Sequence, residues 1–334
     1  MRAKVQPFIA NFLKETNPET IIATAGLLAN LNITTANDAL AKMYNESNNS
    51  KIKTALLPAL DQLKYSGIES IIKSGMEDKE ENVRTTALSL LNNSNVSKAS
   101  LPAIINAIFT KGGIKEQQQI MVVLGKLDLE KTQSILDDLI TQTRDKKLPP
   151  NLSLELKEAV DASGSASLKS KLATVLKERT TNANSAMEEY AETLYGGNWR
   201  EGKNVFTYNS AAQCMRCHAV RGEGGAVGPP LTTIGSTLSR EQILQAMIEP
   251  SARIAPGYGT VILKLKGGQE VVGVLTKESD TELTITTSDA EPLVIAVGRI
   301  EKRENIPSSM PLMGAVLSKR ELRDIVEYLA GLKK

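Results

Sequence analysis

Cysteine and histidine, which serve as metal ligands and redox groups in many proteins, are almost absent from this sequence. Its 334 residues include two cysteines and one histidine. A structural zinc site takes four protein ligands, so these three side chains are too few to form one. Aromatic residues are also scarce: they make up 4% of the chain, against 41% for all hydrophobic residues. This composition suits stacks of helices with aliphatic cores.

The sequence also lacks a long apolar run and an excess of charge of one sign. No run of about 18 apolar residues is present, so we expect no membrane-spanning helix. The net charge is +2, and residues 1–200 carry 24 basic and 23 acidic side chains while residues 201–334 carry 16 and 15. Because no basic stripe stands out, we expect neither nucleic acid nor an anionic lipid surface among the partners.

Both cysteines and the only histidine lie in one pentapeptide, Cys214-Met-Arg-Cys217-His218. Two thiols three residues apart lie on one side of a helical turn, where each can add to a vinyl group of haem, and the following histidine lies under the iron as its proximal ligand. A thiol–disulfide redox pair is the alternative, but the residues before the motif do not resemble the strand of a βαβ unit. The pentapeptide therefore predicts one covalent haem c, bound through Cys214 and Cys217 and ligated by His218.

Residues 1–195 have the periodicity of amphipathic helices. Apolar stripes recur about every thirty to forty residues, which is the period of helical-hairpin repeats. The segment from Asp78 to Ala87 resembles the core of a HEAT repeat. We therefore expect a HEAT-like α-solenoid over residues 1–195, which serves either as a docking surface or as a spacer. The stripes are formed by Ile52, Leu56, Leu60 and Leu63, by Val83, Ala87, Leu90 and Leu91, and by Ile120, Val123, Leu124 and Leu127.

A glycine pair at residues 196–197 separates this region from a second domain, which we place at residues 200–334. The first helix of that domain is expected over residues 200–213. Within it, Gly202 precedes Phe206 by four residues. A glycine at this position would let another helix cross closely, and the helix expected at the end of the chain is the partner that we predict.

After the haem motif, a glycine-rich loop that we expect to be flexible leads into Gly228-Pro229-Pro230-Leu231. This turn, at this distance after C-x-x-C-H, resembles the corresponding turn of class I cytochromes c. The resemblance implies that the carbonyl of Pro229 accepts a hydrogen bond from Nδ1 of His218 and that Leu231 packs on the haem. Such a bond would fix the orientation of the imidazole and raise its basicity.

Between the haem motif and the last helix, the hydrophobic pattern changes from helical to alternating. Four or five short strands predict a small SH3-like barrel, inserted at residues 258–304, with a hairpin turn at Gly267-Gly268. Helices are expected on either side of it, one opened by Ser239 and the other by a capping box of Ser318 and Glu321. The strands are expected over residues 260–266, 270–275, 283–287 and 293–297.

A six-coordinate haem needs one more donor, because the only histidine is already used. A thioether is the usual partner of histidine in such a haem. Met310 precedes Pro311, as the axial methionine of class I cytochromes c commonly precedes proline, and Met313 is the competing candidate. We expect Met310 to be the distal ligand, so that His218 and Met310 hold the iron.

Residues 200–334 as a whole resemble the haem-binding c-type domain of the Planctomycetes–Verrucomicrobia type. In that family the domain often follows HEAT-like repeats, which are themselves preceded by a β-propeller dehydrogenase domain. Pro230 departs from the family pattern, in which an acidic or amide residue follows the Gly-Pro pair, and we expect it to leave the ligand set unchanged. The resemblance rests on five segments that occur in order: CMRCH, EGGAVGPPLTTIG, IEPSARIAPGYGTV, the inserted strands, and SSMPLMG before the last helix.

Haem c is attached outside the cytoplasm in bacteria, so we expect an exported, periplasmic protein. The opening residues, MRAKVQPFIANFLKET, contain no apolar stretch that ends in a small-residue cleavage site. Either the signal has been removed or the chain is one portion of a longer polypeptide. We favour the second, because the opening resembles a helix entered midway through a repeat array.

The expected fold class is mainly α: an N-terminal HEAT-like α-solenoid and a C-terminal class I cytochrome c-like helical domain with a small inserted β-barrel. The leading function is electron transfer through the single haem, with no catalytic residues in the chain itself. The expected redox partner is an upstream or associated dehydrogenase, of which this chain is the electron-transfer portion. One alternative is a haem-based sensor or an open-coordination haem enzyme, which would not need the Met310 thioether. Another is an interaction scaffold carried by the repeats.

Overall fold

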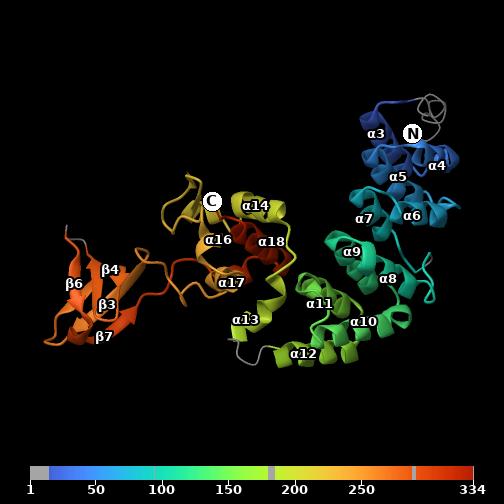
Figure 1. Ribbon diagram of the computed structural model, residues 1–334. Helices are drawn as coiled ribbons and strands as arrows, with labels where there is room; N and C mark the ends of the chain where they lie inside the picture. The colour runs from blue at the N-terminus through green and yellow to red at the C-terminus, as the bar shows by residue number, and fades with distance from the viewer. Residues whose placement is uncertain (1–14, 94, 180–184, 288–290, 334) are drawn as a thin grey trace. The chain divides into compact units, whose positions relative to one another are not determined.

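The computed structural model describes residues 15–93, 95–179, 185–287 and 291–333. The chain divides into two compact units, Met1–Val175 and Leu176–Lys334. It is mainly helical, with a small sheet in the second unit, as the sequence predicted (Figure 1). None of the helices in the described part of the chain is long and apolar enough to cross a membrane. The helix expected at the opening of the chain falls in residues 1–14, outside the described residues.

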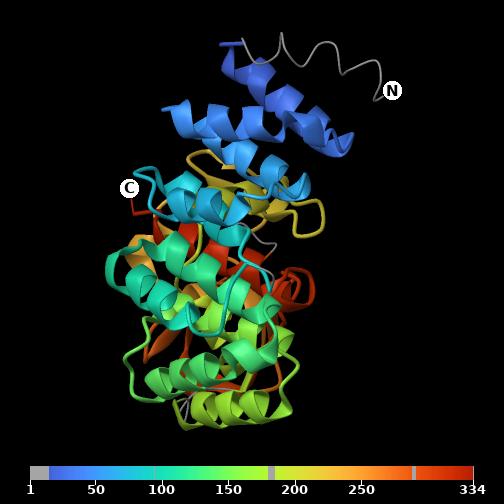
Figure 2. The ribbon, with the colours of Figure 1, turned by 90° about the vertical axis from the view of Figure 1, so that its right-hand side faces the viewer.

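Successive pairs of helices make up the first unit. They are α3 (Pro18–Asn30) and α4 (Asn37–Glu46), α5 (Ser50–Gln62) and α6 (Ile68–Met76), α7 (Glu81–Ser89) and α8 (Leu101–Lys111), α9 (Ile114–Lys126) and α10 (Leu129–Arg144), and α11 (Ser153–Ala162) and α12 (Ala166–Arg179). Helices α3, α5, α7, α9 and α11 form a row in which each contacts the next, and α4, α6, α8 and α10 contact members of this row. Figures 1 and 2 show the stack running from blue α3 to green α11.

The core of this unit is aliphatic, as the composition suggested. Every residue of the three predicted stripes except Leu90 is at most 7% exposed. Leu90, the C-cap residue of α7, is only partly buried and packs against this core, and the neighbouring Leu88 is 2% exposed. From α3 to α7 the buried side chains form one continuous cluster, so each helix pair is stabilised mainly by its neighbours.

A buried ion pair joins α7 to α9. Arg84 Nε lies 2.6 Å from Oε1 of Glu116, whose side chain is 6% exposed, and Arg84 also donates to the carbonyls of Asp78 and Lys79 at 2.8 Å each. Glu116 accepts a further bond from the Gly113 N–H (2.7 Å). Burial by itself would raise the pKa of Glu116, but the hydrogen bonds from Arg84 and Gly113 and the charge of Arg84 hold this pKa below its ordinary value.

Replacing Glu116 with glutamine is expected to lower the free energy of unfolding of the first unit by about 2–3 kcal/mol at neutral pH, because the partly buried guanidinium of Arg84 loses its charged partner. A carboxyl group whose pKa is lower in the folded state stabilises the fold above its unfolded pKa, and this contribution disappears as pH falls through the folded pKa. The difference between wild type and variant should therefore shrink below about pH 4. Denaturant unfolding followed by far-UV circular dichroism measures it.

The matched control is Glu46→Gln, which removes an exposed pair with Lys42 whose side chains are 68% and 73% exposed. Exposed pairs contribute little to stability, so this variant should unfold like wild type at every pH. A Glu116→Gln defect that stays constant down to pH 3 would show that packing, and not the charge of Glu116, accounts for the loss.

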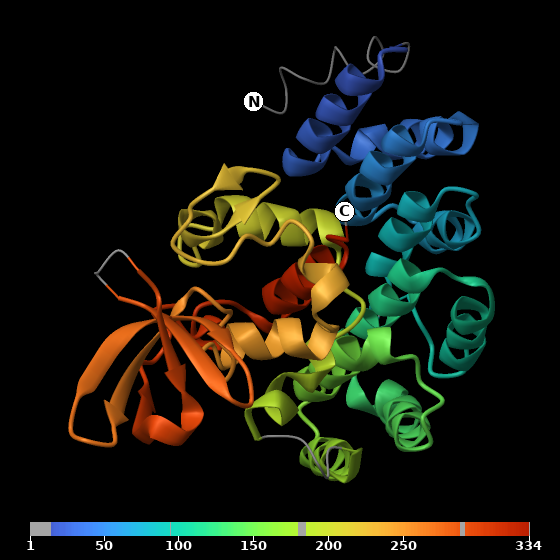
Figure 3. The ribbon, with the colours of Figure 1, turned by 60° about the vertical axis from the view of Figure 1, so that its left-hand side comes forward.

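The second unit is built around a helix crossing near the C-terminus. Helix α18 (Lys319–Ala330) contacts α14 (Trp199–Tyr208), α16 (Ile234–Thr237) and α17 (Arg240–Ile248), and Figure 3 shows red α18 beside yellow α14 and orange α17. One hydrophobic core joins these helices. The remaining short helices are α13 (Ser185–Tyr190), η4 (Ala191–Thr193), α15 (Cys214–Cys217), η5 (Val297–Arg299) and η6 (Met313–Ala315).

Helix α13 and η4 pack with other elements of this unit: α13 contacts α17, and η4 contacts α18. Arg240 on α17 donates to the carbonyl of Leu194 (3.1 Å), and Lys319 on α18 pairs with Glu192 (2.7 Å). These contacts lie within the second compact unit, which begins at Leu176. Periodicity alone does not show this, because the contacts join residues 46 and 127 positions apart in the chain.

The close helix crossing predicted at Gly202 is confirmed. A Cβ atom on Gly202 would overlap the carbonyl oxygen of Asp324 on α18 and lie 2.8 Å from Cβ of Tyr328. One turn later, the ring of Phe206 meets the ring of Tyr328, with centroids 5.7 Å apart. Glycine is therefore required for α14 and α18 to approach at this distance.

Both predicted capping serines open helices. The hydroxyl of Ser239 accepts from the N–H of Gln242 (3.3 Å) at the start of α17, and the hydroxyl of Ser318 accepts from the N–H of Glu321 (3.3 Å) at the start of α18. In each case the third helical residue bonds back to the N–H of the serine, which completes a capping box. Each helix buries an apolar face in the core of the second unit: Ile243, Leu244, Met247 and Ile248 from α17, and Leu322, Ile325, Val326 and Leu329 from α18.

The inserted strands form an open antiparallel sheet, so the expected small barrel is wrong. The strand order is β6-β5-β4-β3-β7, and a closed barrel would need the outer strands to pair. Within the described residues, β7 pairs only with β3. It could contribute few side chains to the interior of a barrel, because all of its residues except the partly buried Ile300 are exposed. The strands are β3 (Gly259–Leu265), β4 (Glu270–Glu278), β5 (Glu282–Thr286), β6 (Leu293–Ala296) and β7 (Ile300–Asn305).

Candidate functional site

The two cysteines lie on a single helical turn, α15. Gln213 precedes the turn in the left-handed conformation (φ 46°), and the N–H of His218 closes it by donating to the carbonyl of Cys214 (2.9 Å). Both thiols are free, and both side chains are partly buried. Both free thiols therefore lie on one helical turn, and the histidine follows this turn directly.

The imidazole of His218 is oriented by the turn that follows the glycine-rich loop. Its Nδ1 lies 2.8 Å from the carbonyl oxygen of Pro229, so the predicted hydrogen bond is present. A carbonyl oxygen can only accept, so Nδ1 carries the proton and Nε2 keeps its lone pair. Gly228 lies against the ring: a Cβ atom there would come within 2.6 Å of Cε1 of His218. The ring is thus held in the tautomer that a metal ligand needs.

The glycine-rich loop, which we expected to be flexible, is attached to the haem motif along its length. The N–H groups of Gly225 and Gly228 donate to the carbonyls of Met215 and Cys217, each at 2.8 Å. A Cβ atom on Gly225 would overlap the carbonyl of Arg216. These glycines therefore let the loop lie directly on the backbone of the motif. Four glycines in residues 222–228 were the sequence signal for this close approach.

Two predicted site residues that lie far apart in the sequence meet at one hydrophobic core. Leu231 is 9% exposed and belongs to the core of the second unit, and Cys214, Met215 and Met310 pack against that core from its edge. Cys214 and Met310 therefore border the same hydrophobic core, and η6, which follows Met310, contacts α17 and α18. The position of Pro230, exposed beside Pro229, keeps it out of this cluster.

The two candidate methionines differ in their surroundings. Met313 is 3% exposed and fills the core, whereas Met310 is partly exposed. The segment around Met310 is held by two serines that the sequence reasoning did not single out. The N–H of Met310 donates to the hydroxyl of Ser308 (3.2 Å), and the N–H of Ser308 donates to the hydroxyl of Ser251 (3.1 Å).

The surroundings of Cys214 differ from those of a typical redox-active thiol. Burial is the main cause that raises the pKa of the Cys214 thiol, with a smaller contribution from Cys217. A redox-active C-x-x-C needs the opposite, a lowered thiol pKa. In the described ranges, moreover, no group of three or more His, Cys, Asp or Glu side chains is placed to hold a metal ion.

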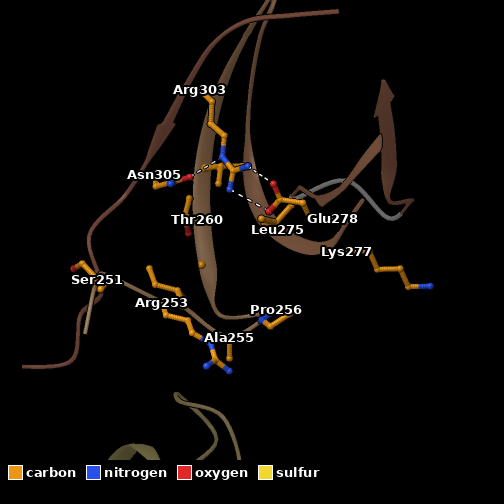
Figure 4. Close-up of a pocket in the computed structure, with 14 residues that line it drawn as sticks. Ser251, Arg253, Ala255, Pro256, Thr260, Leu275, Lys277, Glu278, Arg303 and Asn305 are labelled. Carbon is orange, nitrogen blue, oxygen red and sulfur yellow. Dashed lines mark hydrogen bonds and ion pairs between the residues drawn. The ribbon is translucent and has the colours of Figure 1, made fainter. Parts of the chain in front are cut away.

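A hollow of about 240 Å³ lies at the base of the sheet, between residues 251–256 and strands β3, β4 and β7 (Figure 4). Its most prominent side chain, Arg303, is held by Glu278 (2.5 Å) and Asn305 (2.8 Å), while Lys277 points away from it. Among the described residues, none that lines this hollow is one of the predicted site residues. It is therefore separate from the haem motif.

The residues around α15 fit a covalently bound haem. The fit rests on two free thiols on one turn, an imidazole whose Nδ1 is engaged by Pro229, and a partly exposed thioether, Met310, at the edge of the same apolar core. An apolar cluster beside the ligands suits a macrocycle that is itself mostly hydrophobic.

Comparison with known proteins agrees with this geometry. Residues 199–278 match the family model described as Cytochrome c. The matched range starts with α14, contains α15, the glycine-rich loop and α17, and ends with β4. A comparison with curated proteins found no match. Residues 199–278 are therefore a region similar to cytochrome c, which implies a haem c cofactor and indicates haem-based electron transfer.

Proposed function

We propose that this protein transfers single electrons through one haem c, bound covalently to Cys214 and Cys217 and ligated by His218 and Met310. The observation that carries the proposal is the hydrogen bond between Nδ1 of His218 and the carbonyl of Pro229, 2.8 Å long, directly after two free thiols on one helical turn. A bound haem supplies one-electron chemistry at its iron, with a potential set by its axial ligands and surroundings.

The residues of the chain have distinct parts in this proposal. Pro229 holds the proton of His218 at Nδ1, which leaves Nε2 to face the iron and makes it a stronger donor. Leu231, buried in the core, packs against the haem and limits the access of water. A lower local polarity stabilises the less charged, reduced state, so burial and ligand type act in the same direction on the potential.

Met310 is favoured over Met313 as the distal ligand on grounds of packing. Met313 is 3% exposed, and withdrawing its side chain from the core would leave a cavity. Such cavities cost about 2–5 kcal/mol for a methionine-sized side chain. Met310 only borders the core and can turn without leaving a cavity. Its thioether is therefore the less costly one to direct at an iron atom.

We further propose that the helical repeats of the first unit form a HEAT-like solenoid that holds the haem domain, with its inserted strands at residues 258–304, near an electron donor. The helices of the main row begin at residues 18, 50, 81, 114 and 153, a spacing that is typical of such repeats. The even charge of residues 201–334, 16 basic and 15 acidic, supports tethered delivery, because a freely diffusing partner often uses a charged patch to steer its encounters.

The donor that the sequence resemblance favours is a dehydrogenase, and the attachment of haem c favours the periplasm as the compartment. Tethering replaces a diffusional encounter by a high effective concentration. When the full chain is joined to its dehydrogenase, reduction of the haem by the enzyme and its substrate should be fast and nearly independent of concentration. When residues 176–334 are supplied as a separate protein, whose haem spectrum verifies its folding, reduction should become slow and second-order. Stopped-flow absorbance of the ferrous haem measures both.

Equal rates in the two formats would leave the repeats with no part in electron delivery. Reversible reduction and reoxidation of the haem in both formats would still support the electron-transfer function. The two parts of the proposal are therefore tested separately by the same preparation.

A further inference from the structure

The segment that carries Met310 is held at two points. It runs from the end of β7 to the start of α18, and η6 is its only regular element in the described structure. Ser308, two residues before Met310, is bonded to Ser251 (3.1 Å). Gly314, four residues after Met310, accepts a hydrogen bond at its carbonyl from the hydroxyl of Tyr190 (3.2 Å). Met310 therefore lies between two hydrogen bonds that hold the segment: one from Ser308 to Ser251, which precedes the sheet, and one from Tyr190 of α13 to Gly314.

The contact at Gly314 is close. A Cβ atom on Gly314 would lie 2.5 Å from Oη of Tyr190 and 2.7 Å from Cζ. Burial, and then the charges of Glu189 and Glu192, raise the pKa of Tyr190, so its hydroxyl remains protonated and can donate. Just after η6, the N–H of Leu317 donates to the carbonyl of Met313 (2.8 Å).

Tyr190 is itself fixed to α18 by charged neighbours. Nζ of Lys319 lies 5.0 Å from the centroid of the Tyr190 ring and 2.7 Å from Oε1 of Glu192, whose side chain is 4% exposed. Lys319 also donates to the carbonyl of Glu189. Because a buried carboxylate is costly to leave unpaired, this group of contacts resists displacement of α13 from the start of α18.

We propose that Tyr190 is a positioning residue for the Met310 segment: by holding Gly314, it keeps the thioether of Met310 at the haem iron. The inference rests on the proposed function, in which Met310 is the distal ligand. Tyr190 lies outside residues 199–278, the region similar to cytochrome c. The strength with which Met310 stays bound to the iron therefore depends in part on α13, a helix that precedes this region in the chain.

Tyr195 provides a matched control. It lies in the same part of the chain, and its hydroxyl also bonds within the second unit, to Oε1 of Glu241 on α17 (3.4 Å). Arg240 lies over its ring at 5.3 Å. The contacts that the structure gives to Tyr195 are with α17 and not with the Met310 segment. Tyr190→Phe and Tyr195→Phe therefore each remove one phenol hydroxyl, and they differ in which element loses the bond.

The test uses the full chain with its haem and measures the binding of imidazole to the ferric protein, where imidazole competes with Met310 for the iron. Loss of one hydrogen bond of ordinary strength is expected to make imidazole bind about five-fold more tightly to Tyr190→Phe. Tyr195→Phe should bind imidazole like wild type. Gly314→Ala, whose methyl group crowds the Tyr190 hydroxyl, should shift the affinity in the same direction as Tyr190→Phe.

Amide hydrogen exchange of residues 312–317 gives a second readout that does not need the haem. Exchange in this stretch should be faster in Tyr190→Phe than in Tyr195→Phe, even if both variants melt at the same temperature. Unchanged imidazole affinity together with unchanged exchange in Tyr190→Phe would overturn the inference. A protein that carries no covalent haem would instead contradict the proposed function, and the exchange experiment alone would then decide whether Tyr190 holds the segment.

Discussion

The double replacement of Cys214 and Cys217 by alanine is expected to remove all covalently attached haem. Thioether bonds survive denaturation, whereas the bond from His218 to iron is lost when the protein unfolds. Wild-type protein from an exporting host with haem c maturation should keep its haem colour through acid–acetone extraction, and the double variant should lose it completely. Absorbance of the extracted protein measures the difference.

Arg216→Gln is the control for this experiment. Arg216 is exposed between the two cysteines and donates to the side chain of Gln213 (3.2 Å), the residue just before the turn. It should keep a full complement of haem, because neither thiol nor imidazole is altered. Wild type made in the cytoplasm without maturation enzymes should be the apoprotein. A colourless wild type from the competent host would contradict covalent attachment and, with it, the proposed function.

Met310→Ala is expected to lower the reduction potential and abolish the weak far-red absorption band that sulfur ligation gives to ferric haem. A thioether ligand favours the ferrous state, and axial ligands set haem potentials over a span of about 0.8 V. We expect a decrease on the order of 0.1–0.3 V, which is a fraction of that span. Potentiometric titration with optical detection measures the potential and the band together, and a one-electron curve is expected in both proteins.

Met313→Ala separates ligation from packing. Because Met313 is buried in the core (3% exposed), its truncation should destabilise the second unit by about 2–5 kcal/mol. The far-red band should nevertheless remain. The opposite pattern, in which Met313→Ala loses the band and Met310→Ala keeps it, would move the ligand three residues along the chain. Absence of the band from wild type would show that neither methionine binds the iron and would favour an open-coordination haem.

Local chemistry accounts for most of what could be predicted. The two cysteines share one helical turn and the histidine follows it directly, as positions 214, 217 and 218 in the sequence indicated. The capping boxes at Ser239 and Ser318 are likewise decided within four residues. The strands followed from alternation over five to nine residues, and their positions agree with β3 to β6 to within a few residues.

Predictions that depended on distant contacts were less complete. The glycine-rich loop could be taken as flexible until the structure placed Gly225 on the carbonyl of Arg216. The sheet was expected to close, but closure depends on which strands reach each other, and β7 pairs with β3 on the opposite edge from β6. The Ser308 tether of the Met310 segment also escaped notice, because its partner, Ser251, lies 57 residues earlier in the chain.

The sequence by itself determined the chemistry of the site: one pair of thiols, one imidazole, and a small number of methionines from which a distal ligand could come. The tertiary structure decided how those groups are held. It placed the carbonyl of Pro229 at His218 and brought Met310 to the same core as Cys214. It also assigned Tyr190, 124 residues before Gly314, to the haem unit. The reason is physical. The type of a side chain and its spacing from near neighbours determine which ligand it can bind. The orientation of that side chain depends on packing against segments that are distant in the sequence, and a local sequence pattern contains no information about those contacts.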